Sequence, residues 1–241
     1  LDACCGRALE TGEFTRNQVV CTKTLYNYVN LGFMETRNHH LPEKLRRNTK
    51  AGKVRENKKK LGRSIEERPV EVNCREEFGH WEADLVIGQK SRNDQALLTL
   101  AERKTRQYWI IPIENREADS VIKAFQELQN VYSEHFADVF KSITTDNGSE
   151  FSRLSELEEL AGTLVYFTHP YTSCEKGTNE RHNGIIRRFI PKGKRISDFD
   201  IDEISNIELW CNNLPRKILG YRTPDEVFED ELDSIYSLHT A

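Results

Sequence analysis

Three β-rich runs follow one another in the middle of the chain, WEADLVIG, ALLTLAER and QYWIIPI, and the polar connections between them can form turns. This pattern is typical of an antiparallel meander. Residues 118–132 then place apolar side chains at the spacing of a helix that covers a sheet. KSITTDNGSEF predicts a strand that ends in a turn, SRLSELEELAG a helix that stops near Gly162, and LVYFTHPY a fifth strand. A helix follows, so the expected order is β-β-β-α-β-α-β-α.

Composition excludes several classes of protein. With 241 residues, 37% apolar and 31% charged, the chain is neither collagen, a disulfide mini-domain nor a wholly disordered polymer. The longest uninterrupted apolar stretch covers residues 109–113, far short of the ~20 residues that cross a bilayer, so we expect a soluble, cytoplasmic protein. Its six cysteines lack the spacing of a zinc site and are expected to be reduced thiols. Because residue 1 is Leu and no signal core follows, we expect a fragment or a processed product.

The charge is unevenly distributed. Residues 37–68 hold twelve lysines and arginines against four glutamates, although the whole chain has a net charge of −4. This stretch has too few large apolar residues to offset the entropy lost on folding, which predicts a linker or arm over residues 37–70. Residues 181–197 form a second basic stretch without any acid. Two such stretches favour a polyanionic partner over a merely solvated surface.

Both ends of the chain carry helix signals. Around residues 14–34, a polar break at Cys21 to Lys23 precedes Thr24, which can cap a helix. Thr24 to Asn30 could therefore be the groove-facing helix of a helix-turn-helix, although ordinary short amphipathic helices give the same pattern. Near the other end, the segment TPDE at residues 223–226 combines a capping Thr, a Pro at the first helical position and a Glu three residues after the cap, which predicts a helix start.

Three acidic residues are the candidates for chemistry. Asp84 lies within an apolar strand, where a buried carboxylate needs a cation, and Glu82 on the same strand face is the rival ligand. Asp146 ends a predicted strand just before an Asn-Gly turn. Glu180 lies in a basic helix, on one face with Asn183 and Arg187.

These acids form an oxygen-only site if their strands are neighbours. Oxygen ligands select hard cations such as Mg²⁺ or Mn²⁺. A pair of such ions can activate an attacking oxygen and stabilise a departing one in in-line phosphoryl transfer. The sequence therefore predicts a site for two divalent ions.

Three segments, HWEADLVIG, TTDNGSEF and GTNERHNGIIRRFIPKG, resemble the catalytic segments of bacterial DDE transposases of insertion-sequence family thirty. The resemblance extends from about residue 14 to residue 228, and TLYNYVNLGF and LPEKLRR resemble the segment that joins the family's DNA-binding region to its core. It implies an α/β, ribonuclease-H-like (retroviral-integrase-like) core with a mixed five-stranded sheet flanked by helices, and a small N-terminal helical DNA-binding region. The chain begins inside what the family makes a longer DNA-binding region.

The resemblance divides the chain into a partial helix-turn-helix region at residues 1–36, the basic linker at 37–70, the catalytic core at 71–194 and a helical extension at 195–241. It implies that Asp84, Asp146 and Glu180 are the catalytic, metal-ligating acids. Glu180 is preferred to Glu175 because it opens the E-x-x-N-G segment, and Asn147, Gly148 and Glu150 are expected to support the geometry of the site. The residues expected to contact DNA are Asn183, Arg187, Arg188, Lys192, Arg46 and Arg47.

The expected function is a transposase that cleaves DNA at the terminal inverted repeats of an insertion sequence and transfers the freed 3′ hydroxyl to target DNA. Its expected partners are these DNAs and further copies of the chain, in a dimer or larger assembly on the bacterial nucleoid. Two alternatives stay open. One is a catalytically silent remnant that binds DNA, and the other is a ribonuclease-H-like nuclease that cuts without joining.

Overall fold

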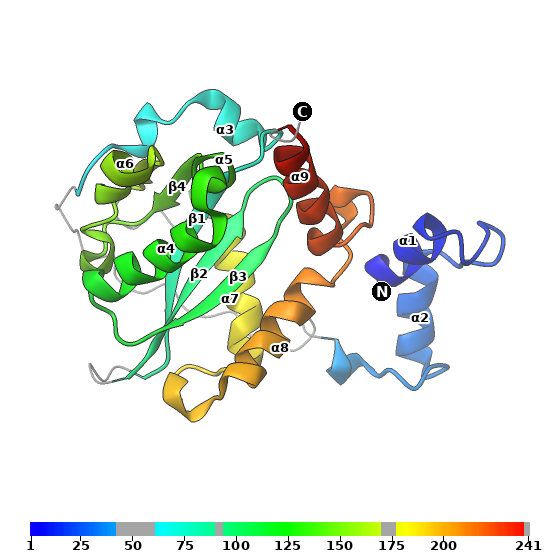
Figure 1. Ribbon diagram of the computed structural model, residues 1–241. Coiled ribbons are helices and arrows are strands. Elements are labelled where there is room, and N and C mark those ends of the chain that lie inside the picture. The colour runs from blue at the N-terminus through cyan, green and yellow to red at the C-terminus, as the bar shows by residue number, and fades with distance from the viewer. Residues whose placement is uncertain (42–60, 90–93, 170–176, 239–241) are drawn as a thin grey trace. The chain divides into compact units, whose positions relative to one another are not determined.

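The computed structural model describes residues 1–41, 61–89, 94–169 and 177–238 (Figure 1). They fall into two compact units, one formed by Leu1–Arg55 with Leu214–Thr223 and the other by Glu56–Asn213 with Pro224–Ala241. The boundaries of these units differ from those of the predicted segments. In particular, most of the expected C-terminal extension, residues 195–241, belongs to the unit that contains the sheet.

The larger unit is built on a five-stranded sheet in the order β3-β2-β1-β4-β5. Its strands are β1 (His80–Ile87), β2 (Ala96–Glu102), β3 (Tyr108–Ile113), β4 (Ser142–Thr145) and β5 (Leu164–Phe167). β1, β2 and β3 pair antiparallel, whereas β4 runs parallel to β1 and β5 parallel to β4. The meander and the mixed sheet predicted from the sequence are therefore confirmed.

Helices cover one face of this sheet with a large apolar core. They are α4 (Ala118–Tyr132), α5 (Phe136–Val139), α6 (Glu156–Ala161) and α9 (Pro224–Leu238). Val121 and Phe125 of α4 pack with Trp81 of β1 and Phe228 of α9 in one buried cluster. α6 ends at Gly162, which adopts the left-handed conformation that glycine favours. The predicted order of elements is confirmed, with the short α5 added.

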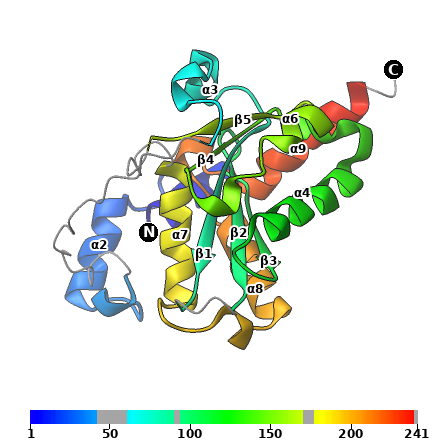
Figure 2. The ribbon, with the colours of Figure 1, turned by 90° about the vertical axis from the view of Figure 1, so that its left-hand side faces the viewer.

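Two helices cover the other face, α7 (Gly177–Phe189) and α8 (Ile201–Asn212). Figure 2 shows α7 and α4 on opposite sides of the sheet. A second buried cluster joins Val86 of β1 and Leu97 of β2 to Ile186 of α7 and Ile207 of α8. Because successive residues of a strand point to opposite faces, β1 and β2 supply side chains to both cores.

Residues 61–70 depart from the prediction of a basic linker that runs to residue 70. The backbone carbonyl of Arg63 accepts a hydrogen bond from Phe167 N–H at 2.9 Å, and Ser64 forms a parallel bridge to Phe167. Leu61 packs on the main core. This segment therefore extends the edge of β5 despite its charge, and α3 (Val70–Cys74) follows it. Residues 42–60 lie outside the described residues.

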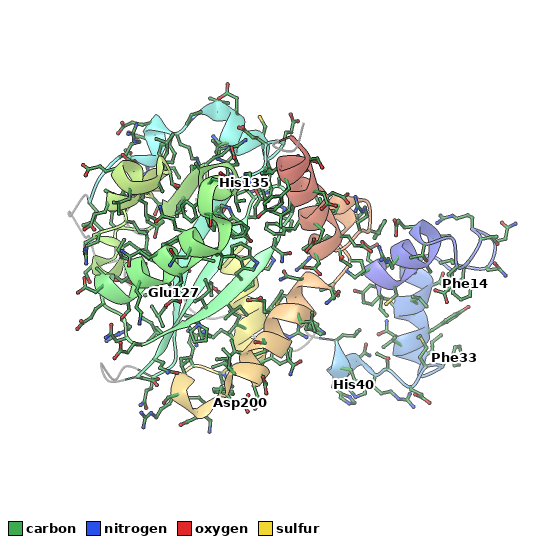
Figure 3. All side chains as sticks on the ribbon, in the orientation of Figure 1. Phe14, Phe33, His40, Glu127, His135 and Asp200 are labelled. Atoms are coloured by element: carbon green, nitrogen blue, oxygen red, sulfur yellow. The ribbon has the colours of Figure 1, made fainter. Side chains whose placement is uncertain are left out.

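The smaller unit contains α1 (Asp2–Glu10) and α2 (Thr22–Leu31). α2 includes the predicted groove-facing segment but begins at Thr22 after Cys21, so the expectation that Thr24 caps it is wrong. Residues 14–20, which begin at Phe14 (Figure 3), form no helix, so the helix that precedes α2 in the chain is α1. Gly6 of α1 is buried against Tyr221, whose ring would lie 2.1 Å from an added Cβ, so this position requires glycine.

Two broader expectations can be compared with the described residues. Five of the six cysteines are among them, and these five form no disulfide. Nowhere in the described part of the chain is a helix both long and apolar enough to cross a membrane.

A partly buried carboxyl joins α8 to the edge strand β3. Glu208 accepts a hydrogen bond from Ile110 N–H at 2.5 Å. Burial, helped by the nearby charge of Asp225, raises its pKa to about 7. In the unfolded chain this carboxyl ionises near pH 4.5. The folded protein therefore favours the neutral form, and that contribution to stability is complete below about pH 4.5 and is lost as the pH rises through about 7.

We expect Glu208→Gln to remove this pH dependence, because a glutamine keeps an acceptor for Ile110 N–H and cannot ionise. The free energy of unfolding, measured by urea titration between pH 5 and 8, should fall with pH by roughly 1–3 kcal/mol more in the parent than in the variant. Parallel curves for the two proteins would show that Glu208 does not titrate in this range.

Candidate active site

Two of the predicted acids follow the point at which the parallel pairing of β1 and β4 ends. The last pair is Glu82 with Thr144; Asp84 lies two residues further along β1, and Asp146 lies two residues beyond Thr144, directly after β4. Because side chains along a strand alternate with a period of two, Asp84 shares the face of Glu82, and we expect Asp146, one residue past β4, to share it as well. The condition set for this site from the sequence, that the two strands are neighbours, is met.

The turn after β4 is held by the residues expected to support it. Asp146 accepts the backbone N–H of Gly148 through Oδ1 at 2.9 Å. Asn147 accepts Leu61 N–H at 3.1 Å and donates from Nδ2 to the carbonyl of Thr168 at 2.5 Å. The amide of Asn147 thus ties the turn to the segments on either side of it, which is a structural role.

Helix α7 lies against β1 and is bonded to it at two successive turns (Figure 2). Asn179 donates from Nδ2 to the carbonyl of Glu82 at 2.9 Å, and Asn183 donates from Nδ2 to Oδ2 of Asp84 at 2.6 Å. Glu180 directly follows Asn179, so its backbone lies on the helix that crosses the strand of Asp84. The side chain of Glu180 is outside what the structure describes, and Glu175 lies outside the described residues.

Asp84 and Glu82, the two candidate ligands on β1, differ in their burial and in their contacts. Glu82 is fully buried, and its Oε1 accepts from Nη1 of Arg103 at 2.5 Å while its Oε2 accepts Asn179 N–H at 3.0 Å. Both of its oxygens are therefore used within the protein. Asp84 is only partly buried, which leaves it the better candidate ligand.

Sequence reasoning missed the polar residues that surround Asn183. The phenol of Tyr108 donates to Oδ1 of Asn183 at 2.7 Å, and the hydroxyl of Thr99 lies 3.2 Å from the same oxygen. Tyr108 is fully buried, and its ring stacks on His182 with a centroid separation of 4.6 Å. Burial raises the pKa of Tyr108 well above its ordinary value, so the phenol keeps its proton. In the sequence, Tyr108 only starts an apolar strand, which gives no signal of a polar role.

The residues expected to contact DNA separate into two groups. Asn183 bonds to Asp84, and Arg187 donates from Nη2 to the carbonyl of Ile87 at 2.8 Å, so both side chains are directed at β1 rather than outward. This placement differs from the predicted phosphate contacts.

By contrast, Arg188 and Lys192 are exposed, and the guanidinium of Arg188 lies 5.4 Å from the ring centroid of Trp210. Exposure leaves the side chains of Arg188 and Lys192 accessible, and their contact with DNA phosphates stays a prediction. Arg46 and Arg47 lie outside the described residues.

The donor set fits a hard divalent cation. Asp84 and Asp146 offer carboxylate oxygens, which Mg²⁺ and Mn²⁺ prefer. Among the described side chains, which exclude that of Glu180, no three His, Cys, Asp or Glu residues gather into a metal-binding group. The part of the predicted site that the described residues provide is therefore Asp84 on β1 and Asp146 directly after the adjacent strand β4.

Comparison with known families gives one match to the larger unit. Residues 75–173 match the model described as "Integrase core domain". The match covers all five strands of the sheet and both candidate aspartates.

The chain is also similar to proteins of known name. It is 42% identical over 211 residues to "Probable transposase for insertion-like sequence element IS1161" of Streptococcus salivarius, covering 88% of this chain and 59% of that one. It is 34% identical over 168 residues to "Transposase InsI for insertion sequence element IS30A" of Escherichia coli, covering 70% and 42%. The chain thus spans about half the length of these relatives. The catalytic core of BIV integrase superposes with a TM-score of 0.48 and 18% identity, covering 66% of this chain and 98% of that one.

Proposed function

Because this chain carries an integrase core domain and belongs to the insertion-sequence transposases related to IS30, we propose that it cleaves DNA at the ends of an insertion sequence and joins them to target DNA. The observation that carries this proposal is the parallel register of β1 and β4, in which Glu82 pairs with Thr144, so that Asp84 and Asp146 each follow the last pair by two residues. α7, which contains Glu180, is bonded to β1 beside them.

The three acids suit phosphoryl transfer without a protein nucleophile. Asp84, Asp146 and Glu180 would hold Mg²⁺ or Mn²⁺, and two such ions would activate the attacking oxygen and stabilise the departing one. Two contacts support this assignment: Asn183 donates a hydrogen bond to Asp84, and the amide of Asn147 ties the turn after Asp146 to the segments on either side of it. Water and then the freed 3′ hydroxyl are the proposed attacking groups.

The experiment that tests this function is a strand-transfer assay with labelled element ends and target DNA, with and without Mg²⁺. We expect joined products only in the presence of the metal. Cleaved but unjoined ends would identify a nuclease, and retained DNA without any cleavage would identify a silent binding protein. Either result contradicts the proposed function.

We further propose that the C-terminal end of α7 and the turn that follows it contact DNA phosphates through Arg188 and Lys192, respectively. Each phosphate contact contributes about 0.9 to the slope of log K against log salt concentration. The double variant Arg188→Ala/Lys192→Ala should bind DNA more weakly and with a slope reduced by about 1–2. The measurement is a salt titration of DNA binding by fluorescence anisotropy.

Lys123 provides the matched control, because it is exposed on α4, which covers the opposite face of the sheet. Lys123→Ala should leave both affinity and slope unchanged. An unaltered slope in the double variant would mean that Arg188 and Lys192 do not contact phosphate.

A further inference from the structure

The carboxylate of Asp84 is reached by a continuous line of hydrogen bonds that begins on β3. The phenol of Tyr108 donates to Oδ1 of Asn183 at 2.7 Å, and Nδ2 of Asn183 donates to Oδ2 of Asp84 at 2.6 Å. The three residues come from β3, α7 and β1, so the line joins elements that are far apart in the sequence.

The phenol determines which way round the Asn183 amide is held. A primary amide has an acceptor oxygen and a donor nitrogen of almost equal size, so either end could face a neighbour. The Tyr108 O–H occupies the oxygen end, and the hydroxyl of Thr99 lies near it as well. The nitrogen end is then left for Asp84, whose ionised carboxylate only accepts hydrogen bonds.

Tyr108 is itself held rigidly. Its backbone N–H donates to Oδ1 of Asn212 at 3.0 Å, and its carbonyl accepts from Nδ2 of the same residue at 2.8 Å. Its side chain is fully buried, with the ring stacked on His182. The position of the phenol oxygen is thus fixed by α8 and α7 together.

We propose that Tyr108 and Asn183 are positioning residues, which hold the Asp84 carboxylate in the orientation that ligates a divalent cation. This inference rests on the proposed function. It gives Asn183 a role inside the protein in place of a contact with DNA. Partners that orient a metal ligand through a hydrogen bond commonly affect metal affinity by about 10–100-fold.

The test is the direct binding of Mn²⁺ to the whole chain without DNA, measured by isothermal titration calorimetry. Tyr108→Phe removes one oxygen and should weaken Mn²⁺ binding by about tenfold, and Asn183→Ala should weaken it by about 10–100-fold. Tyr132→Phe is the matched control, because it deletes a phenol oxygen on α4 on the other side of the sheet, and it should bind Mn²⁺ like the parent.

A second measurement separates positioning from DNA contact. In the cleavage assay, Asn183→Ala should need more Mn²⁺ for half-maximal rate but approach the parent rate when Mn²⁺ is saturating. Its DNA affinity should keep the parent's salt slope, since no phosphate contact is lost. A reduced slope with unchanged Mn²⁺ binding would overturn the inference and restore the DNA contact.

The outcomes distinguish this inference from the proposed function. If the parent binds Mn²⁺ and joins DNA while Tyr108→Phe and Asn183→Ala bind Mn²⁺ like the parent, only the positioning role is overturned. If the parent binds no Mn²⁺ and joins no DNA, both the proposed function and the positioning role are rejected. Should Tyr108→Phe fail to fold, as judged by its circular dichroism and thermal unfolding, Asn183→Ala alone decides the matter by the same criteria.

Discussion

Replacing Asp84 with Asn is expected to abolish DNA cleavage and strand transfer, with a loss of about 10³-fold or more in rate. The physical reason is that the neutral amide oxygen of asparagine is a much weaker ligand for a divalent cation than a charged carboxylate, and losing several kcal/mol of charge stabilisation corresponds to losses of this size. The fold should survive, because the amide introduced by Asp84→Asn still offers an oxygen to Nδ2 of Asn183. Cleavage of labelled element ends in Mg²⁺, with DNA retention measured in parallel, provides the test.

The matched control replaces another carboxylate by its amide, on the helix α4 that covers the opposite face of the sheet from α7. Glu127 is exposed on α4 (Figure 3), and Glu127→Gln should retain full activity. Asp146→Asn and Glu180→Gln should be as inactive as Asp84→Asn, whereas Glu175→Gln should be much milder. Substantial Mg²⁺-dependent cleavage by a folded Asp84→Asn protein would reject its assignment, and an inactive Glu175→Gln beside an active Glu180→Gln would reassign the third acid.

The sheet was predictable because its signals are local. The three β-rich runs, the helical stripe through Val121 and Phe125, and the Gly that ends α6 each depend on residues near one another in the sequence. The position of Asp146 at the end of β4 follows from the same pattern. Periodicity therefore predicted which strands exist and where their acids fall.

The choice between Glu82 and Asp84 could not be predicted in this way. Both lie on the same face of one strand, and the residue that separates them, Arg103, follows β2 and reaches Glu82 only after β1 and β2 have paired. Likewise, Asn183 and Arg187 belong to a basic helix whose composition is that of a DNA-facing surface. Only the packing of α7 on β1 turns their side chains toward the strand.

Two details of the N-terminal half differ from the sequence expectation, namely the residue that caps α2 and the end of the basic linker. Helix α2 begins two residues before the expected capping residue Thr24, since Cys21 takes the N-cap position without a side-chain cap. Residues 61–70 are charged, but the backbone of Arg63 and Ser64 pairs with Phe167 of β5, and backbone hydrogen bonds do not depend on side-chain charge. Composition predicts poorly wherever the backbone itself makes the contact.

The buried pair of Arg103 and Glu82 should have the largest effect on stability. The two side chains are 4% and 0% exposed, and Nη1 of Arg103 lies 2.5 Å from Oε1 of Glu82. Arg103→Met would leave a carboxylate without its partner in the interior, which typically costs about 3–5 kcal/mol in the free energy of unfolding. Urea denaturation monitored by tryptophan fluorescence should show this loss.

The double variant Glu82→Gln/Arg103→Met tests the cause of that loss. The glutamine side chain that it introduces carries no charge but can still accept Asn179 N–H, so much of the lost stability should return. If the double variant is no more stable than Arg103→Met, the stability loss comes from packing rather than from an uncompensated charge.

The same pair should also affect the cleavage rate. Glu82 accepts hydrogen bonds from Asn179 at both its carboxylate and its backbone carbonyl, and Asn179 directly precedes Glu180. We therefore expect Arg103→Met to lower the cleavage rate at temperatures where the variant is folded. The double variant should regain part of that rate, since the same bonds set the position of α7 on the strand that carries Asp84.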